Sequence, residues 1–182
     1  MAKTDRRIRK SQEAIKRAFI ELMLEKQFDQ ITIQNISDRA DVSRRTIYLH
    51  YLDKYDLLDK LIKEHIDEMR EVCEKAEDDA DYISMGEVWF AYFEHHYLFF
   101  SAMLGSKGSP FFRAHFLAFF LDELKRSESE ITTAQEVDHQ FLGAAIVGVV
   151  EWWFKHERPL SPTVMAQRLG ALLERNLEEA NP

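Results

Sequence analysis

The chain has 182 residues, of which 46% are hydrophobic and 31% charged, a balance that excludes a disordered or fibrous protein. A single cysteine, Cys73, excludes an internal disulfide, and no apolar run is long enough to span a bilayer. The net charge of −8 argues against a nucleic-acid partner. However, residues 1–60 carry 13 Lys and Arg against 10 Asp and Glu, while the remaining residues carry 11 against 22, so the net negative charge is confined to the later part of the chain.

Apolar residues recur at helical spacing nearly throughout the chain, and no alternating stretch is long enough to indicate a strand. Only six glycines and four prolines are present, too few for the many turns of an all-β fold. The sequence therefore predicts an all-α protein. Because the N-terminus lacks the pattern of a signal peptide and the chain has one cysteine, we expect a cytoplasmic protein with no membrane partner.

The first part of the chain, residues 1–52, is predicted to hold three helices. Thr32 and Ser43 are polar residues of the type that cap helix N-termini. Val42, just before the second of these caps, and Ile47, four residues after it, form a hydrophobic staple. The predicted helices span residues 6–26, residues 32–40 and a short segment after Ser43.

A long fourth helix follows, capped by Asp53, with Leu52 and Leu57 as a second staple pair. Cys73 lies in its buried stripe and is interpreted as an unreactive core thiol. We assign residues 53–182 to a second helical domain. Its later helices are predicted at residues 84–104, 110–127, 133–156 and 161–180, from the caps Ser109-Pro110, Thr133-x-x-Glu136 and Ser161-Pro162.

The segment from Thr32 to Leu58 carries the most specific signal. Two short helices flank a tight turn at residues 41–43, which is the geometry of a helix-turn-helix. In such a unit the second helix enters the major groove and reads bases with its N-terminal residues. Arg44 and Arg45 could bond bidentately to guanine, and Thr46 could contact a base edge or a thymine methyl.

Residues 36–58 resemble the DNA-binding signature of the TetR/AcrR family of transcriptional regulators. The shared pattern is Val-Ser in the turn, then Tyr-x-His-aromatic at Tyr48–Tyr51, then Lys54 and a pair of leucines. The chain departs from this pattern at Asp41, where the family usually has glycine. The resemblance implies an N-terminal helix-turn-helix domain, a C-terminal ligand-binding and dimerisation domain, and no enzymatic activity.

The resemblance also implies roles for individual residues. Arg44, Arg45 and Thr46 would contact bases of a double-stranded DNA operator. The helix N-termini and nearby donors would hold phosphates, because backbone N–H groups at a helix start favour an anion. The residues assigned to phosphates are Thr32, Tyr48, His50 and Lys54.

By the same resemblance, the last two helices would pair with those of a second copy of the chain. The helix at 133–156 is apolar nearly all round, so more than one neighbour must cover it. A monomeric core is the alternative reading. The residues predicted for dimerisation are Leu142, Ala145, Val149, Trp152, Met165, Leu169, Leu172 and Leu173.

A small-molecule effector of unknown identity would bind among the helices of the second domain, where aromatic and histidine side chains gather. Aromatic rings with a few polar groups are typical of ligand pockets, although such a stripe is more often plain core. The residues predicted to line the pocket are Trp89, Phe93, His96, Tyr97, Phe112, His115, Phe116 and His139.

These observations lead to the hypothesis of a ligand-responsive repressor that binds a palindromic operator as a homodimer. The alternative is a helical protein-interaction module that keeps the fold without specific DNA binding. The chain has no zinc-type spacing of histidine or cysteine and no glycine-rich phosphate loop. We therefore expect no metal site and no cofactor.

Overall fold

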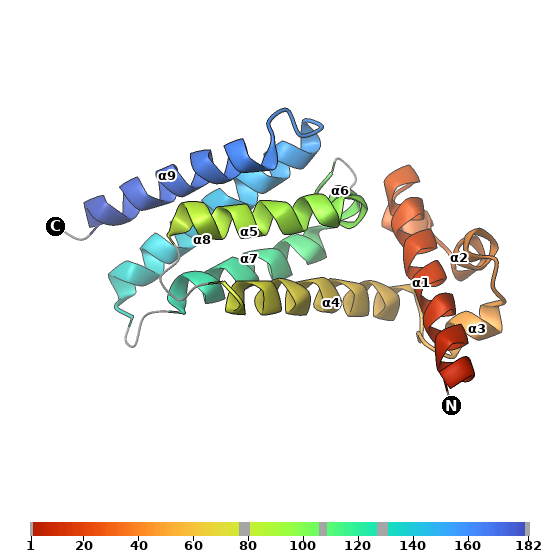
Figure 1. Ribbon diagram of the computed structural model, residues 1–182. Coiled ribbons are helices and arrows are strands. Elements are labelled where there is room, and N and C mark those ends of the chain that lie inside the picture. The colour runs from red at the N-terminus through yellow and green to blue at the C-terminus, as the bar shows by residue number, and fades with distance from the viewer. Residues whose placement is uncertain (1, 77–80, 106–108, 127–130, 181–182) are drawn as a thin grey trace.

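The computed structural model describes residues 2–76, 81–105, 109–126 and 131–180, and helices account for every element in those ranges. In Figure 1 the first helices form a head at one end, and α4 leads away from the head along a body made by the later helices. The elements are α1 (Ala2–Glu25), η1 (Phe28–Gln30), α2 (Ile33–Ala40), α3 (Arg44–Tyr48), α4 (Lys54–Glu74), α5 (Tyr82–His95), α6 (Tyr97–Leu104), α7 (Pro110–Lys125), α8 (Thr133–Lys155) and α9 (Pro162–Ala180). The predicted all-α fold is confirmed.

The head is built on apolar residues that α1, α2 and α3 turn toward one another. Phe19, Ile36 and Ile47 are fully buried in its core. On the outer side, the guanidinium of Arg39 in α2 donates to both carboxylate oxygens of Glu25 in α1, at 2.9 and 2.8 Å. This bidentate pair fixes α2 against the end of α1.

The body packs α5 against α9 at very short range. A Cβ added at Gly170 of α9 would lie 2.7 Å from the backbone Cα of Ile83 in α5. Only a residue without a side chain allows the two helices to approach so closely. At Gly86 of α5 the corresponding distance, to the Cα of Ala166, is 3.3 Å.

The prediction of one continuous helix over residues 84–104 is wrong, because the helix breaks at His96. Its backbone leaves the helical region, with φ −104° and ψ 32°, and α6 then starts in a new direction. The break places Phe99 and Phe100 of α6 in the same buried cluster as Phe93 of α5. A straight helix would carry the two later rings past that core.

Two predicted end signals are also corrected. The capping box of α8 is formed by Thr132 and Gln135, one residue earlier than the predicted pair Thr133 and Glu136. Asp53 caps α4 as predicted, but Leu52 is 80% exposed and forms no staple with the buried Leu57.

Within the described residues, none of the helices is both long and apolar enough to cross a membrane.

Candidate functional site

The turn between α2 and α3 is held by its own backbone and hydroxyl groups. Asp41 adopts the left-handed conformation, with φ 52° and ψ 45°, and its N–H donates to the carbonyl of Ser37. The Ser37 hydroxyl donates to the carbonyl of Val42 at 2.6 Å, and the Ser43 hydroxyl accepts from the N–H of Thr46 at 3.1 Å. Aspartate tolerates this conformation better than most residues, so the turn keeps its shape without glycine.

Helix α3 turns two arginines outward and one isoleucine inward. Ile47 is fully buried and fixes the helix on the head. Arg44 and Arg45 are exposed, and neither side chain has a hydrogen-bond or ion-pair partner in the part of the chain that the structure describes. Thr46 is half-buried, with its hydroxyl 2.9 Å from that of Ser43. Both guanidinium groups are therefore available to an external partner.

Three of the four predicted phosphate contacts lie at the start of α2 or at the end of α3. Tyr48 is 49% exposed and His50 half-buried at the end of α3. The hydroxyl of Thr32 accepts from the N–H of Asn35 at 3.1 Å, and the Asn35 side chain accepts from the N–H of Thr32 at the same distance. This reciprocal pair is a capping box that orders the start of α2.

The fourth, Lys54, is already engaged within the head. Its ammonium donates to the carbonyl oxygens of Phe28 and Asp29, at 3.0 and 3.1 Å. It also lies 4.6 Å from the centroid of the Phe28 ring. An ammonium has three donors, so one remains for a phosphate. Lys54 thus anchors the start of α4 on the turn that follows α1.

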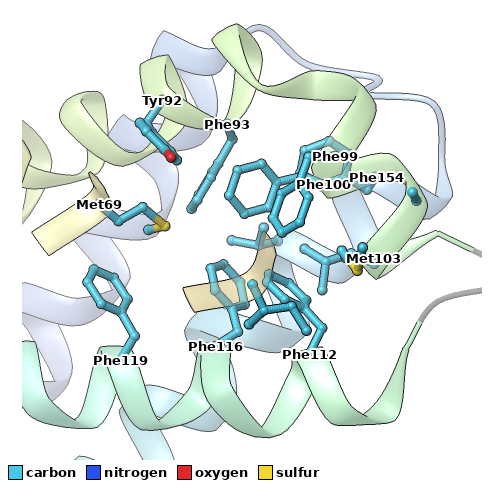
Figure 2. Close-up of a cluster of buried hydrophobic side chains, with 14 of the residues drawn as sticks. Met69, Tyr92, Phe93, Phe99, Phe100, Met103, Phe112, Phe116, Phe119 and Phe154 are labelled. Atoms are coloured by element: carbon cyan, nitrogen blue, oxygen red, sulfur yellow. The ribbon is translucent and has the colours of Figure 1, made fainter. Parts of the chain in front are cut away.

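The predicted pocket residues separate into two groups. Figure 2 shows that Phe93, Phe112 and Phe116 point into one aromatic cluster, where they are fully buried. The centroid of Phe116 lies 5.7 Å from that of Phe93 and 5.2 Å from that of Phe112. Trp89 and His139 are each 3% exposed. These five side chains form core packing.

The other predicted pocket residues lie outside that core. His96 and Tyr97 are half-buried at the break between α5 and α6. The guanidinium of Arg158 lies 3.8 Å from the centroid of the Tyr97 ring. His115 is exposed on α7, with its Nδ1 3.0 Å from the carbonyl oxygen of Phe111. The eight predicted residues thus divide between the buried core and the surface of the body, and their role in binding an effector stays a prediction.

An open pocket of about 680 Å³ lies where the head meets the body. Sequence analysis did not find it, because its walls come from four separate segments. The ends of α1 and η1, the first turns of α4 and the start of α7 each contribute to it. Its lining residues are Met23, Gln27, Phe28, Asp29, Tyr55, Asp56, Leu58, Asp59, Ser109, Pro110 and Phe111.

A second feature missed by sequence analysis is a buried polar group at His65 of α4. Its Nδ1 lies 2.9 Å from the hydroxyl of Tyr92, which donates to Glu68 at 2.8 Å. Burial lowers the pKa of His65 to about 3, with smaller contributions from His96 and Lys16. Burial and then the Glu68 carboxylate raise the pKa of Tyr92. The spacing of His65 and Glu68, one helical turn apart, was the available sequence signal.

The residues predicted for dimerisation also divide into two groups. Leu142, Met165, Leu169 and Leu173 are covered by their own chain, each at 3% exposed or less. Trp152 and Leu172 are 44% and 45% exposed, and Ala145 and Val149 are half-buried. The outward group belongs to an apolar stripe of exposed and half-buried side chains on α8 and α9. Its most exposed members include Val137 at 65% and Phe141 at 61%. In Figure 1, α9 lies on the side of the body away from α4.

Two family models match separate parts of the chain. Residues 15–61 match the family described as bacterial regulatory proteins, tetR family. Residues 85–175 match the family described as transcriptional regulator C-terminal region. The HTH-type transcriptional regulator YxbF of Bacillus subtilis (strain 168) is 38% identical over 60 residues, which is 32% of this chain but only 16% of that protein.

Solved structures resemble the whole described fold. A TetR transcriptional regulator from Streptococcus agalactiae 2603V is 22% identical, with a TM-score of 0.70, covering 93% of this chain and 97% of that one. SmeT, solved in a complex with triclosan, is 21% identical, with a TM-score of 0.61, covering 93% of this chain and 90% of that one. At these identities the likeness concerns the fold.

Proposed function

The chain belongs to the TetR family of DNA-binding transcriptional regulators, and on that premise we propose that it is a repressor which binds a palindromic operator as a homodimer and is released by a small molecule. The observation that carries this proposal is the outer face of α3. Arg44 and Arg45 project from a short, capped helix and have no side-chain partner among the described residues. Unpaired arginines at the start of a helix that follows a tight turn suit the guanine edge in a major groove.

Base reading and phosphate contact are assigned to different residues. Arg44, Arg45 and Thr46 are proposed to meet base edges. Tyr48 and His50, at the end of α3, and Thr32, the N-cap of α2, are proposed to meet phosphates of a docked duplex. Lys54 is assigned a double role, because two of its donors hold the turn at Phe28 and Asp29 and the third can reach a phosphate.

A homodimer is supported by the apolar stripe on α8 and α9. Val137, Phe141 and Trp152 are all exposed along α8, and a Cβ added at Gly148 between them would meet no atom within 4 Å. Exposed apolar stripes of this kind mark surfaces that another protein covers. A twofold axis through the stripe would present two copies of α3 to one duplex, about 34–36 Å apart for successive major grooves.

For the effector, the pocket between head and body is better suited than the aromatic cluster. The cluster is packed and would have to open, whereas the pocket has room of about 680 Å³. Its rings Phe28, Tyr55 and Phe111 and the exposed carboxylate of Asp59 favour a flat ligand that carries a positive charge. The Asp56 carboxylate is already paired with Lys60 at 2.8 Å. A ligand there would contact head and body together and so would favour one relative orientation.

The experiment for DNA reading is a double variant, Arg44→Ala with Arg45→Ala, titrated onto a selected operator by fluorescence anisotropy. Each lost base contact is worth about 1–3 kcal/mol, so affinity for the operator should fall at least about 30-fold. The control, Lys63→Ala with Lys75→Ala, removes the same charge from exposed positions in α4 and just after its end. Operator-specific binding that persists in the arginine variant would show that Arg44 and Arg45 are not the residues that read the bases.

The effector proposal has its own test. Aromatic cations would be screened for release of the operator complex, and active compounds repeated on Phe111→Ala, a change at a side chain that is 48% exposed. Weaker release from the variant is expected. Release that is equal in both proteins would place the effector outside this pocket.

A further inference from the structure

Three side chains that can bind a metal ion meet between α4 and the break after α5. His65 and Glu68 lie one turn apart on α4, and His96 lies at the break itself. One ligand atom from each lies within 4.8 Å of the other two. Oε2 of Glu68 is 3.8 Å from Nδ1 of His65 and 3.9 Å from Nε2 of His96.

The hydroxyl of Tyr92 holds two of these groups toward each other. It lies 2.9 Å from Nδ1 of His65 and 2.8 Å from Oε2 of Glu68. The His65 ring is also fixed by Phe99, against which it stacks with 3.8 Å between centroids. The imidazole of His65 and the carboxylate of Glu68 are therefore positioned before any ion binds, and the hydroxyl oxygen of Tyr92 lies beside both.

The cluster is open to solvent on one side. A groove of about 290 Å³, bounded by Ile20 of α1 and Leu61 of α4, reaches His65, Glu68 and His96. Two positive charges of α1 line the groove, and each is paired: Lys16 with the carboxylate of Glu64 and Arg17 with that of Glu21. An ion could thus enter without unfolding the body, and the charge that would oppose it is partly neutralised.

We propose that His65, Glu68 and His96 form a binding site for a divalent transition-metal ion of the zinc class. Two imidazoles and one carboxylate are a donor set that such ions take, with the fourth position filled by water. Ligand atoms at about 2.0–2.2 Å from one ion lie closer together than the present 3.8–3.9 Å. Because the three ligand atoms are separated by up to 4.8 Å, the partly exposed side chains of Glu68 and His96 must both shift, by about an ångström, to reach one ion.

This site differs from the expectation that the chain has no metal site. A zinc site can be predicted from a sequence when its ligands lie within a few residues of one another. Here His96 is far from His65 along the chain, so no such motif is present. The helix break brings it back to α4. A bound ion would join α4 to the α5–α6 junction, and the proposal does not depend on the proposed function.

The test is a calorimetric titration of Zn²⁺ into the full chain after removal of metal with a chelator. We expect one ion per chain, with affinity reduced at least about tenfold by His96→Ala and by Glu68→Gln. Both positions are partly exposed, and circular dichroism would check that each variant is folded. His115→Ala and His156→Ala are matched controls, because each removes an exposed histidine bonded to a backbone carbonyl.

A second readout separates this site from the single cysteine. Co²⁺ bound to nitrogen and oxygen gives visible bands without a thiolate charge-transfer band, and these bands should be lost in His96→Ala. The proposal is overturned if Zn²⁺ does not bind, if binding is unchanged in both site variants, or if the cobalt spectrum shows thiolate coordination.

Discussion

The variant Lys54→Met distinguishes two roles of Lys54: anchoring the start of α4 and contacting a DNA phosphate. In the structure the ammonium donates to the carbonyl oxygens of Phe28 and Asp29 and lies over the Phe28 ring. Methionine keeps the length and the apolar part of the side chain but removes the charge and all three donors. If Lys54 anchors α4, the variant loses stability even in the absence of DNA.

The magnitude follows from the contacts. A hydrogen bond that involves a charged group contributes about 1.5–3 kcal/mol, and an exposed cation–π contact about 0.5–1 kcal/mol. Because Lys54 is half-buried and water can partly replace its partners, we expect each of the two hydrogen bonds to contribute at the lower end of its range. The free energy of unfolding should fall by about 3.5–4 kcal/mol, which corresponds to a decrease in Tm of about 7–16 °C for a chain of this size.

The assay is denaturation by heat and by urea at one fixed protein concentration, since a dimer would make Tm depend on concentration. Lys63→Met is the control: it makes the same change at an exposed position of α4 and should alter stability by less than about 0.5 kcal/mol. The reasoning is refuted if Lys54→Met unfolds like the unaltered protein and only DNA binding is weakened. That result would leave the residue as a phosphate contact alone.

Three further predictions follow from the geometry. Asp41→Gly should change stability by no more than about 1 kcal/mol, because φ is 52° there, but should tighten DNA binding by removing a negative charge; weaker binding in an anisotropy titration would contradict this. Cys73 should react with a thiol reagent at pH 8 only after unfolding, since burial raises its pKa to about 11; rapid labelling of the native protein would contradict it. Trp152→Glu should yield monomers in sedimentation while the helical content stays unchanged; a persistent dimer would move the interface away from α8.

Local signals allowed much of the fold to be predicted. The caps at Thr32, Ser43 and Asp53 depend on residues two or three positions away, so the chain order alone reveals them. The start of α8 was missed by one residue, because Thr132 and Thr133 are both suitable caps.

Features that depend on distant segments could not be predicted in the same way. The break at His96 leaves the apolar periodicity intact, because helical residues continue on both sides of it. The engagement of Lys54 depends on carbonyl groups of a turn that lies more than twenty residues earlier. Trp89 and Phe93 were predicted to line a pocket from their type alone, but whether aromatic rings enclose a space or fill it depends on how neighbouring helices pack.

Selection of bound sequences from a random DNA pool, with purified protein at moderate salt, tests the central claim most directly. The account predicts recovery of a palindrome with half-sites about one helical turn apart or slightly more, and its loss with the Arg44→Ala and Arg45→Ala variant. Recovery of no common sequence, with binding that only fades as salt rises, would show electrostatic attraction without reading of bases. That result would contradict the assignment of a specific operator.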